Sequence, residues 1–102
     1  MAEFTEVLAL EELPPGASRL VRVGGAEVAL FNVGGEVYAI NDSCIHQGAS
    51  LAAGKVSGLV VTCRAHGFRY DLRTGCIVGA PEIGVASYPV KVVDELIFVA
   101  VS

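Results

Sequence analysis

The sequence predicts an all-β domain, a sandwich or barrel built from short antiparallel strands. Apolar residues recur in short runs that end at turn residues, and none shows the sustained spacing of a helix. Twelve Gly and four Pro are typical of many tight turns between short elements. The 102 residues fit one domain, and 53% hydrophobic with 18% charged residues is a globular composition that excludes intrinsic disorder.

Four strands are expected in the N-terminal part of the chain, at residues 4–10, 19–23, 28–33 and 37–40. The turns that separate them are marked by Pro14-Pro15-Gly16, Gly24-Gly25, Gly34-Gly35 and Asn41-Asp42. Two apolar runs joined by a Gly-Gly pair are typical of a β-hairpin. Residues 19–40 are therefore expected to form two consecutive hairpins.

The middle and the C-terminal part repeat this pattern. Strands are expected at residues 59–63, 68–72, 88–93 and 96–101. The turn signals lie near Gly54, Gly58, Arg73-Thr74-Gly75 and Asp94-Glu95. About eight short strands at this spacing favour a sandwich or barrel.

Composition also narrows the function. Eleven Asp and Glu against seven Lys and Arg give a net charge of −4, which argues against a general nucleic-acid binder. The longest strongly apolar run, residues 96–101, is far shorter than a membrane span, and the N-terminus lacks the pattern of a secretory signal. We therefore expect a cytoplasmic protein. Three cysteines, an odd number, favour metal or redox chemistry over a disulfide framework.

Charge is unevenly distributed along the chain. Residues 1–42 carry a net charge of −5 and residues 81–102 a net charge of −2. Residues 43–80 carry Lys55, Arg64, Arg69 and Arg73 against Asp71 alone, a net charge of +3. This middle stretch also holds both histidines and all three cysteines. Either the surface charge is scattered by chance, or a subdomain of about residues 43–81 is inserted into a β base of about residues 1–42 and 82–102.

The chemistry-bearing pattern consists of two Cys-His pairs. Cys44 and His46 form the first pair, and Cys63 and His66 form the second after sixteen intervening residues. Four N and S ligands suit zinc or an iron–sulfur cluster. Structural zinc sites usually group ligands of one type, whereas mixed pairs suit a two-iron cluster held between two loops. Buried packing and a nucleophilic Cys63–His66 pair explain the pattern less well, since the latter leaves the first pair without a role.

Two segments, Cys44-Ile-His46-Gln-Gly48 and Cys63-Arg-Ala-His66-Gly67-Phe-Arg-Tyr70-Asp71, resemble the cluster-binding loops of Rieske proteins. The similarity extends to Thr74-Gly75 and to Gly79-Ala-Pro81, which resembles the proline-containing loop that covers the cluster in this family. The chain is most similar to the soluble Rieske ferredoxins of bacterial aromatic ring-hydroxylating dioxygenase systems.

The resemblance implies a Rieske fold, with a small cluster-binding β subdomain inserted into an antiparallel base. It also implies one [2Fe–2S] cluster, with Cys44 and Cys63 on the inner iron and His46 and His66 on the outer one. High-potential relatives carry disulfide cysteines where this chain has Gly48 and Ala65.

The same relatives have a serine where this chain has Phe68, which removes a hydrogen bond to the cluster. The potential is therefore expected near the bottom of the Rieske range of about −150 to +300 mV. Tyr70 either bonds a cysteine sulfur or packs as a core aromatic. Gly67 and Pro81 are expected to form part of a small, uncharged rim around the outer iron.

By resemblance, the protein is a one-electron carrier and not an enzyme. Its donor would be an NAD(P)H-dependent flavoprotein reductase and its acceptor a terminal oxygenase, both bound transiently by a monomer. The chain has no Rossmann glycine motif, and two histidines committed to a cluster cannot also build a mononuclear iron site. The alternatives are a Rieske small subunit of an assimilatory NADH nitrite reductase and a structural zinc-binding module.

Three further residues have simple expected roles. Cys76 has no partner motif and is expected to be a buried small hydrophobic residue rather than a ligand. Lys55 and Arg64 either steer acidic partner surfaces or are ordinary solvated charges.

Overall fold

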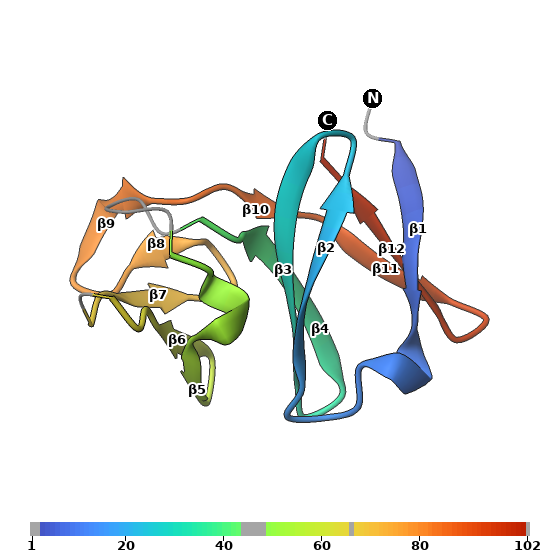
Figure 1. Ribbon diagram of the computed structural model, residues 1–102, viewed down its shortest axis with the longest axis horizontal. Coiled ribbons are helices and arrows are strands. Elements are labelled where there is room, and N and C mark those ends of the chain that lie inside the picture. The colour runs from blue at the N-terminus through green and yellow to red at the C-terminus, as the bar shows by residue number, and fades with distance from the viewer. Residues whose placement is uncertain (1–2, 44–48, 66, 102) are drawn as a thin grey trace.

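The computed structural model describes residues 3–43, 49–65 and 67–101. Within these ranges the chain forms twelve strands and two short 3₁₀ helices, and the strands make three antiparallel sheets (Figure 1). The predicted all-β architecture is confirmed. No helix in the described ranges is long and apolar enough to cross a membrane.

A four-stranded sheet occupies the centre of the molecule, with the strand order β10-β4-β3-β2. Its strands are β2 (Ser18–Val23), β3 (Ala26–Val33), β4 (Glu36–Asn41) and β10 (Ser87–Tyr88). The two expected hairpins are present, because Gly24, Gly25, Gly34 and Gly35 all have positive φ angles, between 54° and 99°. Such angles are required at both positions of the tightest hairpin turn, and glycine adopts them without steric cost.

A three-stranded sheet of order β1-β12-β11 packs on one side of the four-stranded sheet. It comprises β1 (Phe4–Ala9), β11 (Val90–Val93) and β12 (Leu96–Ala100), and the 3₁₀ helix η1 (Leu10–Glu12) follows β1. The expected single strand at 88–93 is wrong, because the chain changes sheet at Pro89. Proline has no N–H for a ladder, so β10 pairs with β4 while β11 pairs with β12.

The third sheet has five strands in the order β5-β6-β7-β8-β9 and lies on the left in Figure 1. It comprises β5 (Lys55–Ser57), β6 (Val60–Thr62), β7 (Arg69–Asp71), β8 (Cys76–Ile77) and β9 (Ala80–Gly84), and the 3₁₀ helix η2 (Leu51–Ala53) precedes it. The sequence predicted β6 and β7 but missed the other three, which are short or mostly exposed and lack apolar alternation.

Strand β3 is buried on both faces, which explains its continuous apolar sequence. Val28 and Leu30 belong to the core shared with the three-stranded sheet. Ala29 and Phe31, which alternate with them, belong to a second core that includes Cys63 and other residues of the five-stranded sheet. Strand β3 therefore joins the two cores. The second core contains Cys63, a residue of the candidate site.

Candidate metal centre

Cys63 directly follows β6 and begins a tight turn that leads to β7. Its backbone N–H donates to the Phe68 carbonyl at 2.8 Å, and the Gly67 N–H donates to the Cys63 carbonyl at 3.0 Å. Gly67 has a φ of 75°, which a residue with a Cβ rarely adopts. Cys63 itself is 1% exposed, whereas Ala65 and Gly67 are exposed. The turn therefore joins a buried thiol to a solvent-facing tip.

The surroundings of the Cys63 thiol are apolar. Val61, Tyr70 and Leu72 lie in the same buried cluster, and the half-buried Phe68 packs against it. Both described cysteines, Cys63 and Cys76, are free thiols. Cys63 is thus a free, buried thiol at the start of an exposed turn, and a thiol there is available to bind a metal.

The other three predicted ligands, Cys44, His46 and His66, lie outside the described residues, and so does Gly48. The residues on either side of 44–48 are described, and they are paired with each other. Ser43 and Ser50 form an isolated antiparallel bridge. The two ends of this segment are therefore held side by side.

Asp42 fixes this pairing, although the sequence predicts it only as part of a turn. It is 4% exposed, and its Oδ1 accepts hydrogen bonds from the Ser50 hydroxyl at 2.9 Å and the Ala52 N–H at 2.8 Å. Its backbone carbonyl accepts the Leu51 N–H at 2.7 Å, and its own N–H donates to the Glu27 carbonyl. Asp42 thus attaches the start of η2 to the end of β4. An aspartate two residues before the first motif cysteine was the available signal.

Pro81 lies on the edge strand β9, near the turn at Gly79, which has a φ of 89°. Pro81 is exposed, and it lines a cleft of about 370 Å³ together with Ile77, Val78 and Cys76. Cys76 is only half-buried, so the expectation of a buried residue is wrong. It stands on a two-residue strand opposite Gly84, which has no side chain to cover it.

An ion pair closes the turn that follows β7. Arg73 donates to Asp71 through its backbone N–H at 2.8 Å, through Nε at 3.1 Å and through Nη2 at 2.9 Å. These bonds favour the charged carboxylate, so the pKa of Asp71 is lowered and the pKa of Arg73 is raised. The pair leaves little net charge on this part of the sheet.

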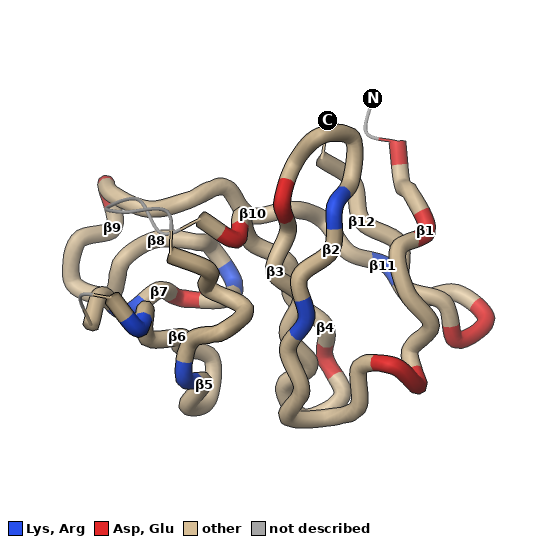
Figure 2. The backbone as a smooth tube through the Cα atoms, in the orientation of Figure 1, with Lys and Arg blue, Asp and Glu red and all other residues tan. Residues whose placement is uncertain are grey.

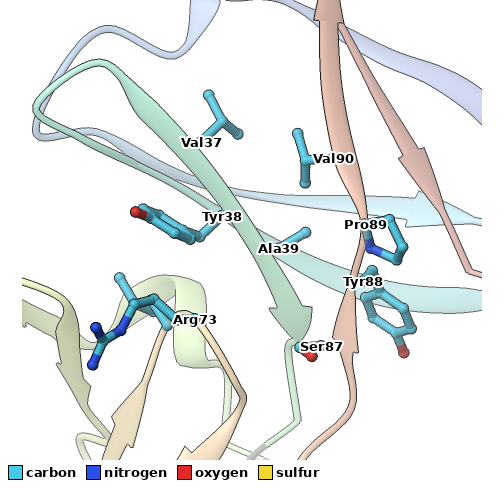
Figure 3. A pocket seen from close by; sticks show the side chains of 9 residues that line it. Val37, Tyr38, Ala39, Arg73, Ser87, Tyr88, Pro89 and Val90 are labelled. Atoms are coloured by element: carbon cyan, nitrogen blue, oxygen red, sulfur yellow. The ribbon is translucent and has the colours of Figure 1, made fainter.

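A separate cavity of about 340 Å³ lies between β4 and the β10–β11 segment. Figure 3 shows Val37 and Tyr38 on one side and Pro89 and Val90 on the other. The guanidinium of Arg73 is bound to Asp71 at 2.9 Å and points away from Tyr88 in this view. Cys63, the predicted ligand that lies within the described residues, does not line this cavity.

The residues present fit an iron–sulfur cluster. Cys63 would supply a soft sulfur ligand from a buried, apolar environment, and its turn contains the small residues Ala65 and Gly67. Four ligands of mixed type, two sulfur and two nitrogen, match a histidine-ligated two-iron cluster.

Known proteins of this kind match nearly the whole chain. The family described as "Rieske [2Fe-2S] domain" matches residues 3–89. The ferredoxin component of the naphthalene 1,2-dioxygenase system of Pseudomonas aeruginosa is 34% identical over 101 residues, covering 98% of this chain and 97% of the relative. The family match confirms the resemblance seen in the two motifs and favours a [2Fe–2S] cluster over structural zinc.

Solved structures agree with the fold. A chain in a complex of reduced oxygenase and oxidized ferredoxin of carbazole 1,9a-dioxygenase superposes with a TM-score of 0.85 at 34% identity, covering 95% of this chain and 92% of that chain. A structure described as the small subunit of an NADH-dependent nitrite reductase from Mycobacterium tuberculosis superposes with a TM-score of 0.91 at 25% identity, covering 100% and 97%. The Rieske fold expected from the motifs is confirmed.

Proposed function

This chain belongs to the Rieske [2Fe-2S] domain family, and on that premise we propose that it carries single electrons between two redox proteins. The observation that carries the proposal is the Cys63 turn, a buried thiol joined to an exposed tip within a family-matched motif. When bound, the cluster supplies one reversible electron. The chain itself turns over no substrate.

We assign the cluster to Cys44 and Cys63 on the inner iron and to His46 and His66 on the outer iron. The burial of Cys63 and the exposure of Ala65, which precedes His66, support this order. The cluster-binding part would comprise about residues 43–81 and the base about residues 1–42 and 82–102. The five-stranded sheet extends to Gly84, so the second boundary falls within β9.

The ligand set and its surroundings determine the reduction potential. Two thiolates and two neutral imidazoles leave the oxidised site near zero net charge, so reduction is easier than in a four-thiolate site. Phe68 offers no side-chain hydrogen bond to sulfur, and its half-buried ring packs against the Cys63 cluster. The fully buried Tyr70 is the proposed remaining hydroxyl donor to a cysteine sulfur. Voltammetry is therefore expected to give a potential in the lower part of the range of about −150 to +300 mV.

The proposed partners are an NAD(P)H-dependent flavoprotein reductase as donor and a terminal aromatic-ring oxygenase as acceptor. A naphthalene dioxygenase ferredoxin at 34% identity and a match within an oxygenase–ferredoxin complex support this choice. We propose that the protein works in the cytoplasm as a monomer and binds each partner transiently. Small interfaces are typical of such redox encounters.

A second candidate is a permanent small subunit of an NADH nitrite reductase. The TM-score of 0.91 to the structure described in this way favours it. The two functions differ in stable association, which sedimentation of the purified protein with and without each candidate partner would measure. A carrier remains monomeric and binds weakly, whereas a subunit forms a complex that persists through gel filtration.

The test of the carrier function is an EPR spectrum after dithionite reduction, together with iron and sulfide analysis. A Rieske carrier gives a rhombic signal whose average g value lies below that of a four-thiolate ferredoxin. Purified protein containing zinc, or iron-loaded protein that dithionite leaves EPR-silent, would contradict the proposal.

A further inference from the structure

One face of the five-stranded sheet carries a row of basic side chains. Lys55 on β5 pairs with Thr62 on β6, and Thr62 pairs with Arg69 on β7. Residues paired in this way point to the same face, and a strand spacing of about 4.8 Å separates Lys55 from Arg69 by about 10 Å at the backbone. The adjacent residues Val61 and Tyr70 are fully buried on the opposite face, so Lys55 and Arg69 point to solvent and are exposed.

Arg64, exposed in the turn between β6 and β7, extends this row, which we call the basic row. Its basic residues have no acidic partner. Lys55, Arg64 and Arg69 make no ion pair within 4.0 Å in the part of the chain that the structure describes. Residues 1–2, 44–48, 66 and 102 contain no Asp or Glu side chain that could supply one. The acidic residue next along the face, Asp71, is already neutralised by Arg73. The row therefore keeps its positive charge.

The two other sheets have the opposite charge. Acidic residues predominate there, and Figure 2 shows their red segments mainly on the right, with blue segments around β5–β7 on the left. Two of the three basic residues on the right are paired, Arg19 with Glu12 at 3.9 Å and Arg22 with Glu27 at 3.3 Å. The net charge of −4 is therefore the sum of one positive and one negative end of the molecule.

The basic row borders the metal centre. Thr62 directly precedes Cys63, and Arg64 directly follows it. Arg69 follows Phe68, whose carbonyl accepts the Cys63 N–H at 2.8 Å. An electron leaves by the shortest path to the partner, so a partner must dock against this end of the molecule.

We propose that Lys55, Arg64 and Arg69 form the docking surface for an acidic face of a redox partner protein. The inference rests on the proposed carrier function and adds the chemistry of the partner surface. The negative end opposes docking little, because the long axis is 37 Å and charges in solution are screened over about 8 Å at physiological salt. Local complementary charge then steers encounter and orientation.

The test uses small oxidants of opposite charge. Holoprotein reduced with dithionite and freed of excess reductant is mixed with ferricyanide or with tris(phenanthroline)cobalt(III) at increasing NaCl concentration. One electron passes from the protein to each complex, giving ferrocyanide or the cobalt(II) complex. If the basic row dominates, salt slows the ferricyanide reaction and accelerates the cobalt reaction. If the net charge of −4 dominates, both trends are reversed.

Two charge-matched variants locate the effect. Lys55→Glu with Arg69→Glu is expected to lower the ferricyanide rate at low salt by on the order of tenfold and to reverse its salt dependence. The control, Arg19→Glu with Arg22→Glu, changes the net charge equally on β2. Compared at about 0.1 M salt, where the screening length is about 10 Å, the control is expected to leave the ferricyanide rate within about twofold of the wild type. Poly-L-glutamate, as an acidic polypeptide, should inhibit the ferricyanide reaction of the wild type and of the control variant only.

The outcomes separate this inference from the carrier function. Two results would overturn the docking surface while leaving a working carrier. The first is oxidation of the wild-type protein by ferricyanide that becomes faster with salt. The second is an equal change of the ferricyanide rate in the two double variants. Absence of a Rieske EPR signal would overturn the carrier function and the inference that rests on it. Matching EPR spectra and circular dichroism of all proteins show that each variant is folded and loaded.

Discussion

Replacing Asp42 by Ala is expected to loosen the segment that leads into the first pair of proposed ligands. The carboxylate is 4% exposed and accepts two hydrogen bonds, from Ser50 at 2.9 Å and from the backbone of Ala52 at 2.8 Å. A hydrogen bond to a charged group contributes about 1.5–3 kcal/mol. Loss of both therefore removes about 3–6 kcal/mol, an upper estimate because water can re-enter the site.

Asp42→Asn provides a graded comparison. Both hydrogen bonds end on the same oxygen, Oδ1, and an asparagine oxygen can accept both in the same place. Two neutral hydrogen bonds together contribute about 1–3 kcal/mol, against about 3–6 kcal/mol for the two bonds to the charged carboxylate, so this variant is expected to lose about 2–3 kcal/mol. Ser50→Ala removes only one of the two bonds and is the control for partial loss.

The assay is the rate of iron release to a chelator, measured beside the urea midpoint of the same holoproteins. The expected order of release is Asp42→Ala fastest, then Asp42→Asn, then the wild type, because the residue holds both ends of segment 44–48 together. Equal release from the alanine variant and the wild type would refute the role of Asp42. An asparagine variant as damaged as the alanine variant would refute the hydrogen-bond argument, since shape and acceptor are retained.

Three further outcomes are expected. His66→Cys should shift the EPR signal toward that of a four-thiolate cluster and lower the potential by voltammetry, whereas an unchanged spectrum and potential would exclude His66 as a ligand. Glu95→Gly should raise the stability by about 1 kcal/mol in thermal unfolding, because Glu95 has a φ of 63° in the β11–β12 turn; an unchanged midpoint would argue against strain there. Asp71→Asn should destabilise the protein at pH 7, and this difference should shrink as the pH falls below about 4, because Arg73 lowers the pKa of Asp71 in the folded state. Urea titrations at pH 7 and pH 3 measure it, and a difference independent of pH would contradict the ion pair.

Local turn chemistry made part of the fold predictable. The Gly24-Gly25 and Gly34-Gly35 pairs adopt left-handed angles, and the strands on either side form the two expected hairpins. Strands β3 and β12 were also predictable, because each contains an apolar run long enough to cross a sheet. The prediction of one strand over residues 88–93 is wrong because Pro89 interrupts the apolar run and cannot donate a ladder hydrogen bond.

Other features depend on contacts that are distant in sequence. Strands β5, β8 and β9 have two to five residues and are held by their neighbours rather than by their own apolar pattern. The sequence predicts a turn near Gly54, but a Cβ there would lie 2.6 Å from the Thr62 carbonyl, so close packing against β6 requires glycine at this position. The role of Asp42 likewise depends on partners eight and ten residues away. The two Cys-His pairs predict the ligands from the sequence alone, whereas the role of Asp42 is visible only in the three-dimensional structure.

The position of Cys63 connects the candidate metal centre to the hydrophobic core. A one-electron carrier must bind its cluster in nearly the same geometry in both oxidation states, because rearrangement slows electron transfer. Cys63 belongs to the core that contains Phe31 of β3, and β3 packs on its other face against Ile97 and Val99. A shift of the Cys63 thiol would disturb a close-packed interior on both sides of the central sheet. Packing across the central sheet therefore restrains Cys63, a residue of the proposed ligand set.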